Sequence, residues 1–492
     1  MSYILAIDQS TSGTKAILFD TRGKVLDKAA LTHRQIYPQP GWVEHDVEAI
    51  LSSVRTSIWE VASRNPARMK KLAALSISNQ RETVVVFDRR TGRPLHNAIV
   101  WQDRRGDRIC AKLTKQGHGP TVLRKTGLKI DTYFSASKIR WLVENKPAIA
   151  AALKRGDAVI GTIDTYLIHR LTGGKVFATD FTNASRTLLF DIGKLQWDAS
   201  LCKLFKVPLG ALPEVRESAA HFGETDVNGL LLKRVPIIGV MGDSQASLFA
   251  QRCYQPGMAK ATFGTGTSVL LNIGDKLRVT EKGAVTALAW VWRGKPTYAF
   301  EGIISFSAAT IEWLKNQLGL IQTAGEVEQL ANLVPDNGGV YLVPAFAGLS
   351  APYWSPDARA AIVGMTAHTR KEHVVRAAQE AIAYQIRDVL DMMRAEAKVK
   401  LQSLHADGGP TRNRFLMQFT ADLTRMRIHV ADVAGSSARG AAMNGWLGLG
   451  VHRTLEDLSA LTHNHTEFKP QMSQSKANQL HGRWHTAVER VL

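Results

Sequence analysis

A turn of small polar residues, numbers 8–15, separates two apolar runs at the start of the chain. Serine, threonine and glycine allow a backbone to approach a phosphate closely, and successive N–H groups in such a turn can form an anion-binding nest. Asp8, at the end of the first run, could hold Mg²⁺ or its water shell. Hydrogen-bond donors and a compact positive charge would come from Thr11, Ser12, Gly13 and Lys15. An ordinary polar hairpin is the alternative interpretation of this turn.

A second turn of similar composition, residues 264–268, lies in the other half of the chain. Two such turns could clamp both ends of a polyphosphate in a cleft, with Thr265 bonding the phosphoryl group that is transferred. A third glycine loop, residues 407–409, precedes a helical pattern and could contact a nucleotide at a helix N-terminus. Together the three loops favour nucleotide binding over unrelated polar turns.

Asp243 follows a glycine and an apolar run over residues 236–240. A carboxylate held at the end of a buried strand is positioned for general-base work on a hydroxyl. Aspartate is also a common N-cap, here of a helix expected over residues 245–252. The sequence leaves both interpretations open.

An Arg–Glu pair and two aromatic residues could form a pocket for a ligand with adjacent hydroxyl groups. Arg81 and Glu82 lie between two apolar runs and offer donors and acceptors side by side. Trp101 and Tyr133 would supply apolar walls and a phenol. The alternatives are a solvated turn with a surface ion pair for the first two residues, and core packing for the aromatic ones.

The elements that would position these residues alternate between strands and helices. Apolar runs predict strands over residues 3–7, 15–19, 73–78, 84–87, 236–240, 259–263 and 269–273. Apolar residues at helical spacing predict helices over residues 47–61, 374–389 and 415–423, the first of them capped by Asp46. This order predicts an α/β fold of sheets covered by helices. We expect two domains of similar design, residues 1–247 and 248–492, each with one phosphate-type turn.

Composition excludes several classes of protein. The 492 residues are 45% hydrophobic and 21% charged, as in ordinary globular proteins and unlike disordered or collagen-like chains. No apolar run approaches the ~18 residues of a membrane span, and the first run reaches Asp8 too early for the core of a signal peptide. The cysteines are few and far apart, which suits a reducing compartment. We therefore expect a cytoplasmic protein without membrane insertion.

The net charge of +19 raises the possibility of a nucleic-acid partner. The densest basic clusters, such as residues 103–108, are short and interleaved with acidic residues. No sequence pattern of a known nucleic-acid-binding module accompanies them. We expect no dedicated nucleic-acid partner, and a charge that helps to attract a nucleotide and other anions.

In combination, these motifs resemble the FGGY family of carbohydrate kinases over roughly residues 3–450, and most of all the members that phosphorylate glycerol. The resemblance is carried by segments dispersed along the chain, at residues 7–11, 35–46, 79–83, 97–102, 133–145, 161–165, 179–187, 264–266, 343–346, 351–354, 407–409 and 413–419. It implies two actin-like (ribonuclease-H-like) ATPase domains that close over ATP, Mg²⁺ and a polyol. The active site would lie in the cleft between them.

The resemblance also implies a role for each matching residue. Asp243 would accept the proton of the reacting hydroxyl and, with Asp8, lie near the metal. The terminal phosphates would contact Thr11, Ser12, Lys15 and Thr265. The rest of the nucleotide would contact Ala308, Glu312, Gly409 and Asn413. The polyol would be held by Arg81, Glu82, Tyr133 and Asp243, with Trp101 as an apolar wall.

Two expected pocket positions depart from the residues usual in the glycerol-phosphorylating members. Ser244 replaces a glutamine and Ser268 replaces a phenylalanine. The resemblance implies ATP-dependent phosphorylation of a terminal hydroxyl of glycerol or a near relative by a homodimer or homotetramer. Because both serines make the pocket roomier and more polar, the alternative is a longer substrate such as erythritol, threitol, erythrulose, xylitol or xylulose. A more distant alternative is an ATPase of the actin and Hsp70 type without a small-molecule acceptor.

Overall fold

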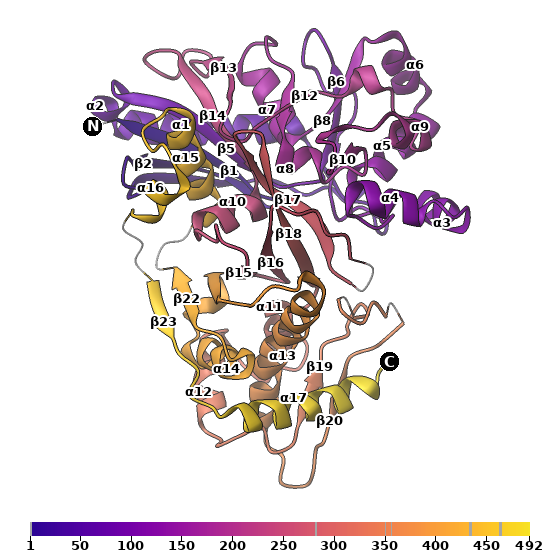
Figure 1. Cartoon of the computed structure of the whole chain (residues 1–492), viewed down its shortest axis with the longest axis vertical. Coiled ribbons are helices and arrows are strands. Elements are labelled where there is room, and N and C mark those ends of the chain that lie inside the picture. The colour runs from indigo at the N-terminus through magenta and orange to yellow at the C-terminus, as the bar shows by residue number, and fades with distance from the viewer. Residues whose placement is uncertain (1, 281–282, 350, 356, 432–434, 462–464) are drawn as a thin grey trace.

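Two lobes, each built around a β-sheet with flanking helices, form the molecule (Figure 1). This computed structural model describes residues 2–280, 283–349, 351–355, 357–431, 435–461 and 465–492. The upper lobe in Figure 1 comes mainly from the first half of the chain and the lower lobe mainly from the second. The predicted α/β architecture is confirmed.

The sheet of the first lobe has six strands in the order β13-β14-β5-β1-β2-β3. In chain order these are β1 Tyr3–Gln9, β2 Gly13–Asp20, β3 Val25–Thr32, β5 Leu72–Asn79, β13 His221–Thr225 and β14 Val235–Gly242. β5 is parallel to both β1 and β14, with Asn79 opposite Gln9 on one side and Gly242 on the other. The carboxyl ends of three strands therefore meet at one edge of this sheet.

Helix α1, Val47–Arg64, covers this sheet as the apolar periodicity predicts. Its buried residues recur at helical spacing, and the side chain of Asp46 accepts hydrogen bonds from the N–H groups of Glu48 and Ala49. The predicted N-cap is confirmed.

The remaining elements of the first lobe surround the sheet and a smaller one of order β4-β7-β6-β8. They are β4 Glu44–His45, α2 Pro66–Met69, β6 Val84–Asp88, β7 Ala98–Ile99, α3 Asp107–Lys115, α4 Gly119–Thr126, α5 Ser135–Asn145, α6 Pro147–Arg155, β8 Ala158–Thr162, α7 Ile163–Leu171, β9 Ala178–Asp180, α8 Phe181–Ala184, β10 Phe190–Asp191, β11 Gln196–Trp197, α9 Ala199–Leu204, a 3₁₀ turn Leu209–Ala211 and β12 Glu214–Arg216.

The second sheet has seven strands in the order β17-β18-β16-β15-β21-β22-β23. In chain order these are β15 Met258–Phe263, β16 Thr267–Gly274, β17 Val285–Trp292, β18 Lys295–Ile304, β21 Ser403–Gly408, β22 Ile428–Ala431 and β23 His465–Phe468. β15 pairs antiparallel with β16 and parallel with β21, as β1 does with β2 and β5 in the first sheet. The two halves therefore repeat one arrangement, which brings the loops after β15 and β21 to the same edge.

The other elements of the second half are mostly helices. They are α10 Asp243–Ala250, α11 Ala308–Asn316, α12 Glu326–Asn332, β19 Tyr341–Val343, β20 Ala361–Val363, α13 Lys371–Ala397, a 3₁₀ turn Gly409–Arg412, α14 Arg414–Thr424, α15 Ser436–Gly448, α16 Leu455–Ser459 and α17 Gln474–Glu489. None of the helices in the described part of the chain is long and apolar enough to cross a membrane.

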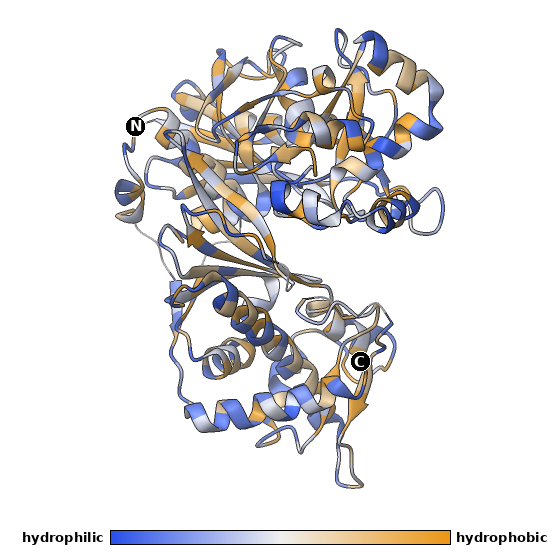
Figure 2. Ribbon diagram, turned by 45° about the vertical axis from the view of Figure 1, so that its right-hand side comes forward, coloured by the Kyte–Doolittle hydropathy of each residue, from blue (hydrophilic) through white to orange (hydrophobic). Residues whose placement is uncertain are grey.

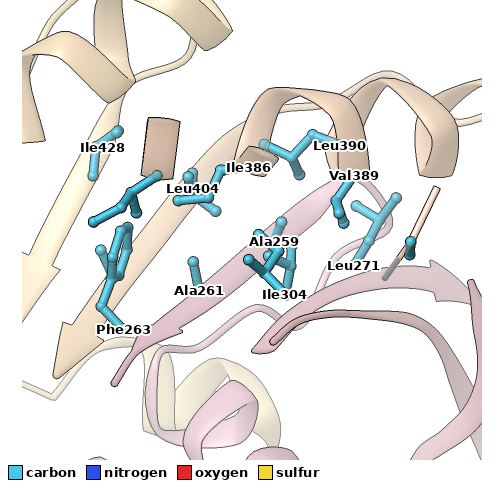
Figure 3. Packing of buried hydrophobic residues seen from close by; sticks show 14 of the residues in the cluster. Ala259, Ala261, Phe263, Leu271, Ile304, Ile386, Val389, Leu390, Leu404 and Ile428 are labelled. Atoms are coloured by element: carbon cyan, nitrogen blue, oxygen red, sulfur yellow. The ribbon is translucent and has the colours of Figure 1, made fainter. Parts of the chain in front are cut away.

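The core of the lower lobe lies between its sheet and α13. Side chains of β15 and β16 face a row of aliphatic residues on that helix, and all of them are buried (Figure 3). The labelled members are Ala259, Ala261, Phe263, Leu271, Ile304, Ile386, Val389, Leu390, Leu404 and Ile428. Hydrophobic strand segments lie inside both lobes, whereas α17 on the outside is largely hydrophilic (Figure 2). This burial fixes the strands whose ends carry the polar loops.

Two connections tie the lobes together. Helix α15 belongs to the second half of the chain but packs on the first sheet, with Trp446 buried beside Ile4. In the other direction, β17 reaches the first lobe, where the N–H of Thr286 donates to the carbonyl of Gly127 at 2.9 Å. The division into residues 1–247 and 248–492 stays a prediction, and each half contributes an element to the other's lobe.

Candidate active site

The first polar turn joins β1 to β2. The N–H of Ser10 donates to the carbonyl of Gly13 at 2.8 Å, and the indole of Trp101 donates to the Thr11 hydroxyl at 2.9 Å. A side chain at Gly13 would place its Cβ 2.6 Å from the carbonyl oxygen of Leu31, so the turn requires glycine there. Ser12 is exposed, and its neighbours in the turn remain partly accessible. The hairpin therefore holds its shape while presenting hydroxyl and N–H donors to a ligand.

Asp8 and Lys15 face each other across the same hairpin. The carboxylate of Asp8 is buried and lies 3.6 Å from the exposed Lys15 ammonium. Burial raises the pKa of Asp8, while Lys15 acts in the opposite direction and Asp243 adds to the rise. Asp8 and Asp243 are therefore close enough to interact electrostatically, as two carboxylates near one metal would be.

The second polar turn joins β15 to β16 and is built in the same way. The N–H of Gly264 donates to the carbonyl of Gly266 at 2.8 Å, and the N–H of Ala309 donates to the carbonyl of Thr265 at 3.1 Å. A Cβ at Gly266 would collide with the carbonyl oxygen of Ile304. The backbone of the turn is thus anchored on the first residues of α11, and Thr265 remains exposed.

Two cavities adjoin these turns and share Gly409. One, of about 570 Å³, lies between the lobes and is lined by Asp8 and Lys15 on one side and Asp407 and Gly408 on the other. The other, of about 490 Å³, is lined by Ala308, Ile311, Glu312, Ile382, Gly409 and Asn413, among others. A charged cleft that continues into a partly apolar pocket suits a ligand with a phosphate chain and an aromatic base. All four residues predicted to contact the rest of the nucleotide line the second cavity.

Asn413 has a structural role in addition to its place in this cavity. Its side-chain oxygen caps α14 by accepting from the N–H of Leu416 at 2.9 Å, and its amide donates to Gln379 at 2.6 Å. Glu312 is exposed at the mouth of the same cavity. The loss of Asn413 would therefore disturb the helix as well as any ligand contact.

The residues of the cleft suit a hard divalent cation. Asp8 and Asp407 line one cavity, and the Oδ1 atom of Asp407 is buried without a hydrogen-bond partner among the described residues. Its Oδ2 atom accepts from the Ser247 hydroxyl at 2.8 Å. Carboxylate oxygens beside a phosphate cleft are the usual ligands of Mg²⁺ or of its water shell.

Asp243 is the first residue of α10, and Gly242 is the cap residue before it. The predicted N-cap role is therefore wrong, because the helix begins at Asp243 itself. One carboxylate oxygen accepts from the N–H of Ser244 at 2.7 Å and lies 3.3 Å from the Arg81 guanidinium. The side chain is 35% exposed, so it can still contact a ligand. This geometry is compatible with the interpretation of Asp243 as a general base.

Beside Asp243, four charged side chains form a buried network. Arg81 lies 2.7 Å from Glu301 and 3.8 Å from Glu82. Arg186 lies 2.7 Å from Glu82 and 2.6 Å from Glu301. Every member is at most 4% exposed, so the alternative of a solvated surface pair at Arg81 and Glu82 is wrong.

The two acids of this network differ in their electrostatic surroundings. Burial raises the pKa of Glu82, although Arg81 and Arg186 oppose the change. Burial also acts on Glu301, but Arg186 and Arg81 outweigh it and lower its pKa to about 2. Glu301 is thus a fixed negative charge that pairs with both arginines.

Aromatic and small polar residues complete the wall of this region. The rings of Trp101 and Tyr133 are 5.3 Å apart, and both are half-buried, with Tyr133 packed against the edge of a hydrophobic core cluster. Burial raises the pKa of Tyr133, so its phenol stays protonated and can donate a hydrogen bond. The Ser268 hydroxyl lies 3.3 Å from Glu301, and half-buried Ser244 follows Asp243 on α10. The predicted polyol-site residues therefore gather in one region.

Three residues of this site were missed by the sequence reasoning: Arg186, Glu301 and Gln245. The side-chain oxygen of Gln245 accepts from Arg81 at 3.1 Å. Arg186 lies within one of the resembling segments, and Glu301 is an acidic residue in a run of buried positions on β18. An unpaired acid in a buried strand is a usable signal, because such a group needs a charged partner.

The sequence matches known protein families over most of its length. Residues 3–250 match the N-terminal domain of the FGGY family of carbohydrate kinases, and residues 259–448 match the C-terminal domain of that family. The chain belongs to this family. The resemblance predicted from the motifs is confirmed, and a kinase family implies ATP as the phosphoryl donor.

Relatives of this FGGY kinase cover its whole length. Glycerol kinase 1 of Thermotoga maritima is 44% identical over 490 residues, covering 100% of this chain and 99% of that protein. A glycerol kinase of Carboxydothermus hydrogenoformans is 46% identical over 489 residues, covering 99% of this chain and 98% of that protein. The structure of Plasmodium falciparum glycerol kinase with ADP superposes with a TM-score of 0.95 at 37% identity, covering 100% and 98%. A xylulose kinase of Lactobacillus acidophilus shares the fold, with a TM-score of 0.89 at 22% identity. The match covers 99% of this chain and 97% of that chain. The predicted two-domain kinase fold is confirmed.

Two adjacent glycines of this FGGY kinase should respond differently to substitution by alanine. Gly409→Ala places a methyl group where no described atom lies within 4 Å, beside both cavities. We expect an unchanged melting temperature and a KM for ATP raised about tenfold. Gly408 has φ +104° and abuts the carbonyl of Phe263, so Gly408→Ala should lower the melting temperature instead. Equal KM values for Gly409→Ala and wild type would remove Gly409 from the nucleotide site.

Proposed function

We propose that this FGGY kinase transfers the γ-phosphoryl group of ATP to a terminal hydroxyl of glycerol. The observation that supports this most is the place of Asp243, which is 35% exposed at the start of α10, contacts Arg81 and adds to the rise that burial causes in the pKa of Asp8. Asp8 and Lys15 of the first hairpin line the cavity between the lobes. The full-length relatives named glycerol kinase support the choice of acceptor. We also propose that the protein is cytoplasmic and acts as a homodimer or homotetramer.

The polyol would be held by groups that differ in hydrogen-bonding character. The Arg81 guanidinium and the Tyr133 phenol would donate to its oxygen atoms, and Glu82 would accept from a hydroxyl. Trp101 would cover the carbon chain, and its hydrogen bond to Thr11 would link this wall to the first phosphate hairpin. Binding the acceptor would thus align the reacting hydroxyl with the nucleotide.

Asp243 would then accept the proton of the terminal hydroxyl as its oxygen bonds to the γ-phosphorus and the bond to ADP breaks. Thr11, Ser12, Lys15 and Thr265 would donate to the phosphate oxygens on which charge develops. Mg²⁺, held by Asp8 and Asp243 directly or through water, would neutralise phosphate charge when bound. Closure of the two lobes would exclude water and so favour transfer over hydrolysis.

A longer polyol or ketose is the second candidate acceptor. Ser268 and Ser244 are small side chains in the wall of this region, and Ser268 adds a hydroxyl beside Glu301. A roomy, polar pocket wall would accept additional carbon atoms and hydroxyl groups.

A substrate panel decides between these acceptors. We expect the highest kcat/KM with glycerol among glycerol, erythritol, threitol, erythrulose, xylitol and xylulose. Ser268→Phe fills the pocket, so it should lower the kcat/KM of any longer acceptor relative to glycerol by about tenfold or more. Ser52→Phe, on the exposed face of α1, is the matched control and should leave the ratios unchanged. Preference for a longer acceptor would replace glycerol by that compound but keep the kinase assignment.

A further inference from the structure

A carboxylate and two histidines converge at the outer end of the lower lobe, where α17 crosses α13 (Figure 1). Asp388 comes from α13, and His481 and His485 lie one turn apart on α17. The Oδ1 atom of Asp388 is 2.6 Å from Nε2 of His481 and 2.9 Å from Nε2 of His485. The three ligand atoms all lie within 4.8 Å of one another.

The other oxygen of Asp388 is held by two further donors. Its Oδ2 atom accepts from the Trp484 indole at 2.7 Å and from the Tyr353 hydroxyl at 2.9 Å. These two hydrogen bonds fix the orientation of the carboxylate, so Oδ1 points at both histidines. Donors of this kind around a ligating carboxylate hold it in place for a metal ion.

Burial makes this cluster rigid on one side and accessible on the other. Asp388 and His481 are buried, whereas the side chain of His485 is 49% exposed. The rings of the two histidines are 4.2 Å apart, as expected for positions i and i+4 on one helix face. An ion can therefore enter from solvent at His485 and reach two preformed ligands behind it.

The chemistry of the donor set selects the ion. Two imidazole nitrogens and one carboxylate oxygen, with room for water, form a ligand set that Zn²⁺ accepts in proteins. Mg²⁺ and Ca²⁺ prefer oxygen ligands, so the two imidazoles favour a first-row transition metal. We propose that Asp388, His481 and His485 bind one divalent transition-metal ion, Zn²⁺ in the first instance, and that this ion clamps α17 to α13.

Binding changes the proton balance of the cluster in a defined way. The ion takes the lone pairs of both Nε2 atoms and a carboxylate oxygen, and any proton on Nε2 that cannot move to Nδ1 is released to solvent. Water would complete the coordination on the exposed side. Helix α17 lies on the outer surface of the lower lobe and contacts α13 at this cluster. The ion would therefore stabilise the packing of this helix and would not act in the cleft.

Other histidines could also bind an added metal ion and need a control. His405, His429 and His465 lie on adjacent strands, with ring centroids 4.9 Å and 4.7 Å apart. His429→Gln is therefore the matched control for His485→Gln, since each removes one imidazole from a group of neighbouring rings.

The experiment uses the full-length chain without a histidine tag, freed of metal by a chelator. Zn²⁺ is titrated against a chromophoric chelator, and the melting temperature is measured with and without Zn²⁺. We expect one strong equivalent in wild type and in His429→Gln, with affinity at least about tenfold lower in His485→Gln and in the double variant His481→Gln/His485→Gln. The rise in melting temperature with Zn²⁺ should be lost in the same two variants.

Substitution of Co²⁺ gives a signal that a purely structural role of the histidines would not produce. Wild type should show d–d absorption of coordinated Co²⁺, and His485→Gln, whose fold is checked by circular dichroism without metal, should not. Absence of a strong Zn²⁺ equivalent in wild type would overturn the proposal. Binding unaffected by the double variant, or lost only in His429→Gln, would overturn it as well.

Discussion

Replacing Asp243 with asparagine should lower kcat by about 10³-fold and leave nucleotide affinity close to that of wild type. A positioned general base contributes roughly 10²–10⁴-fold, and asparagine keeps the size of the side chain but cannot accept the proton. Asp243 lines neither of the two cavities that adjoin the phosphate-type turns, so ADP binding should be preserved. The rate is measured as acceptor-dependent ADP release. ADP affinity is measured by calorimetry without Mg²⁺, because Asp243 is also a proposed ligand of the metal.

Asp46→Asn is the matched control for this substitution. Asp46 caps α1 and lines neither of the two cavities, and asparagine is an equally good N-cap, so both rate and stability should stay near wild type. Near-normal turnover in Asp243→Asn would contradict the assignment of Asp243 as the general base. A parallel loss of ADP affinity would instead place Asp243 in nucleotide binding.

Replacing Arg186 with methionine should lower the free energy of unfolding by about 3–5 kcal/mol, since it breaks a buried ion-pair network. Arg186 is fully buried and lies within 2.7 Å of Glu82 and Glu301. Without it, the two acids share Arg81 alone, and the Arg81 guanidinium is drawn away from Asp243. We therefore also expect a raised KM for the acceptor, measured beside urea unfolding.

The exposed ion pair between Arg104 and Asp107 supplies the control for Arg186→Met. These side chains are 72% and 48% exposed, so Arg104→Met should cost less than about 1 kcal/mol. If Arg186→Met were no more destabilising than this control, the network would have no energetic role. An unchanged KM for the acceptor would show that Arg81 keeps its orientation without Arg186.

Local features of this fold were predictable from the sequence. Apolar runs closed by glycine and hydroxyl residues predicted both hairpins, and Asp46 predicted the start of α1. The repeated order of strands also predicted a second half that resembles the first. These features depend on interactions between residues near one another in the chain, and such interactions are readable from spacing.

The pairing within the charged network could not be predicted, because its partners come together only in the folded chain. Arg81 and Glu301 are 220 positions apart, and whether an Arg–Glu pair is buried depends on what packs above it. The same holds for α15, which crosses from the second half of the chain to the first sheet. At Asp243 the sequence allowed two roles, and only the observed start of α10 separates them.

The central claim is that the γ-phosphoryl group of ATP is transferred to a terminal hydroxyl of glycerol. Phosphorus NMR of a reaction with ATP, Mg²⁺ and glycerol follows that group directly. We predict the phosphorus signal of a phosphomonoester formed at the terminal hydroxyl of glycerol. This signal should grow in step with ADP and be absent without glycerol. Release of inorganic phosphate at the same rate with and without glycerol would contradict the account, because the protein would then be an ATPase without an acceptor.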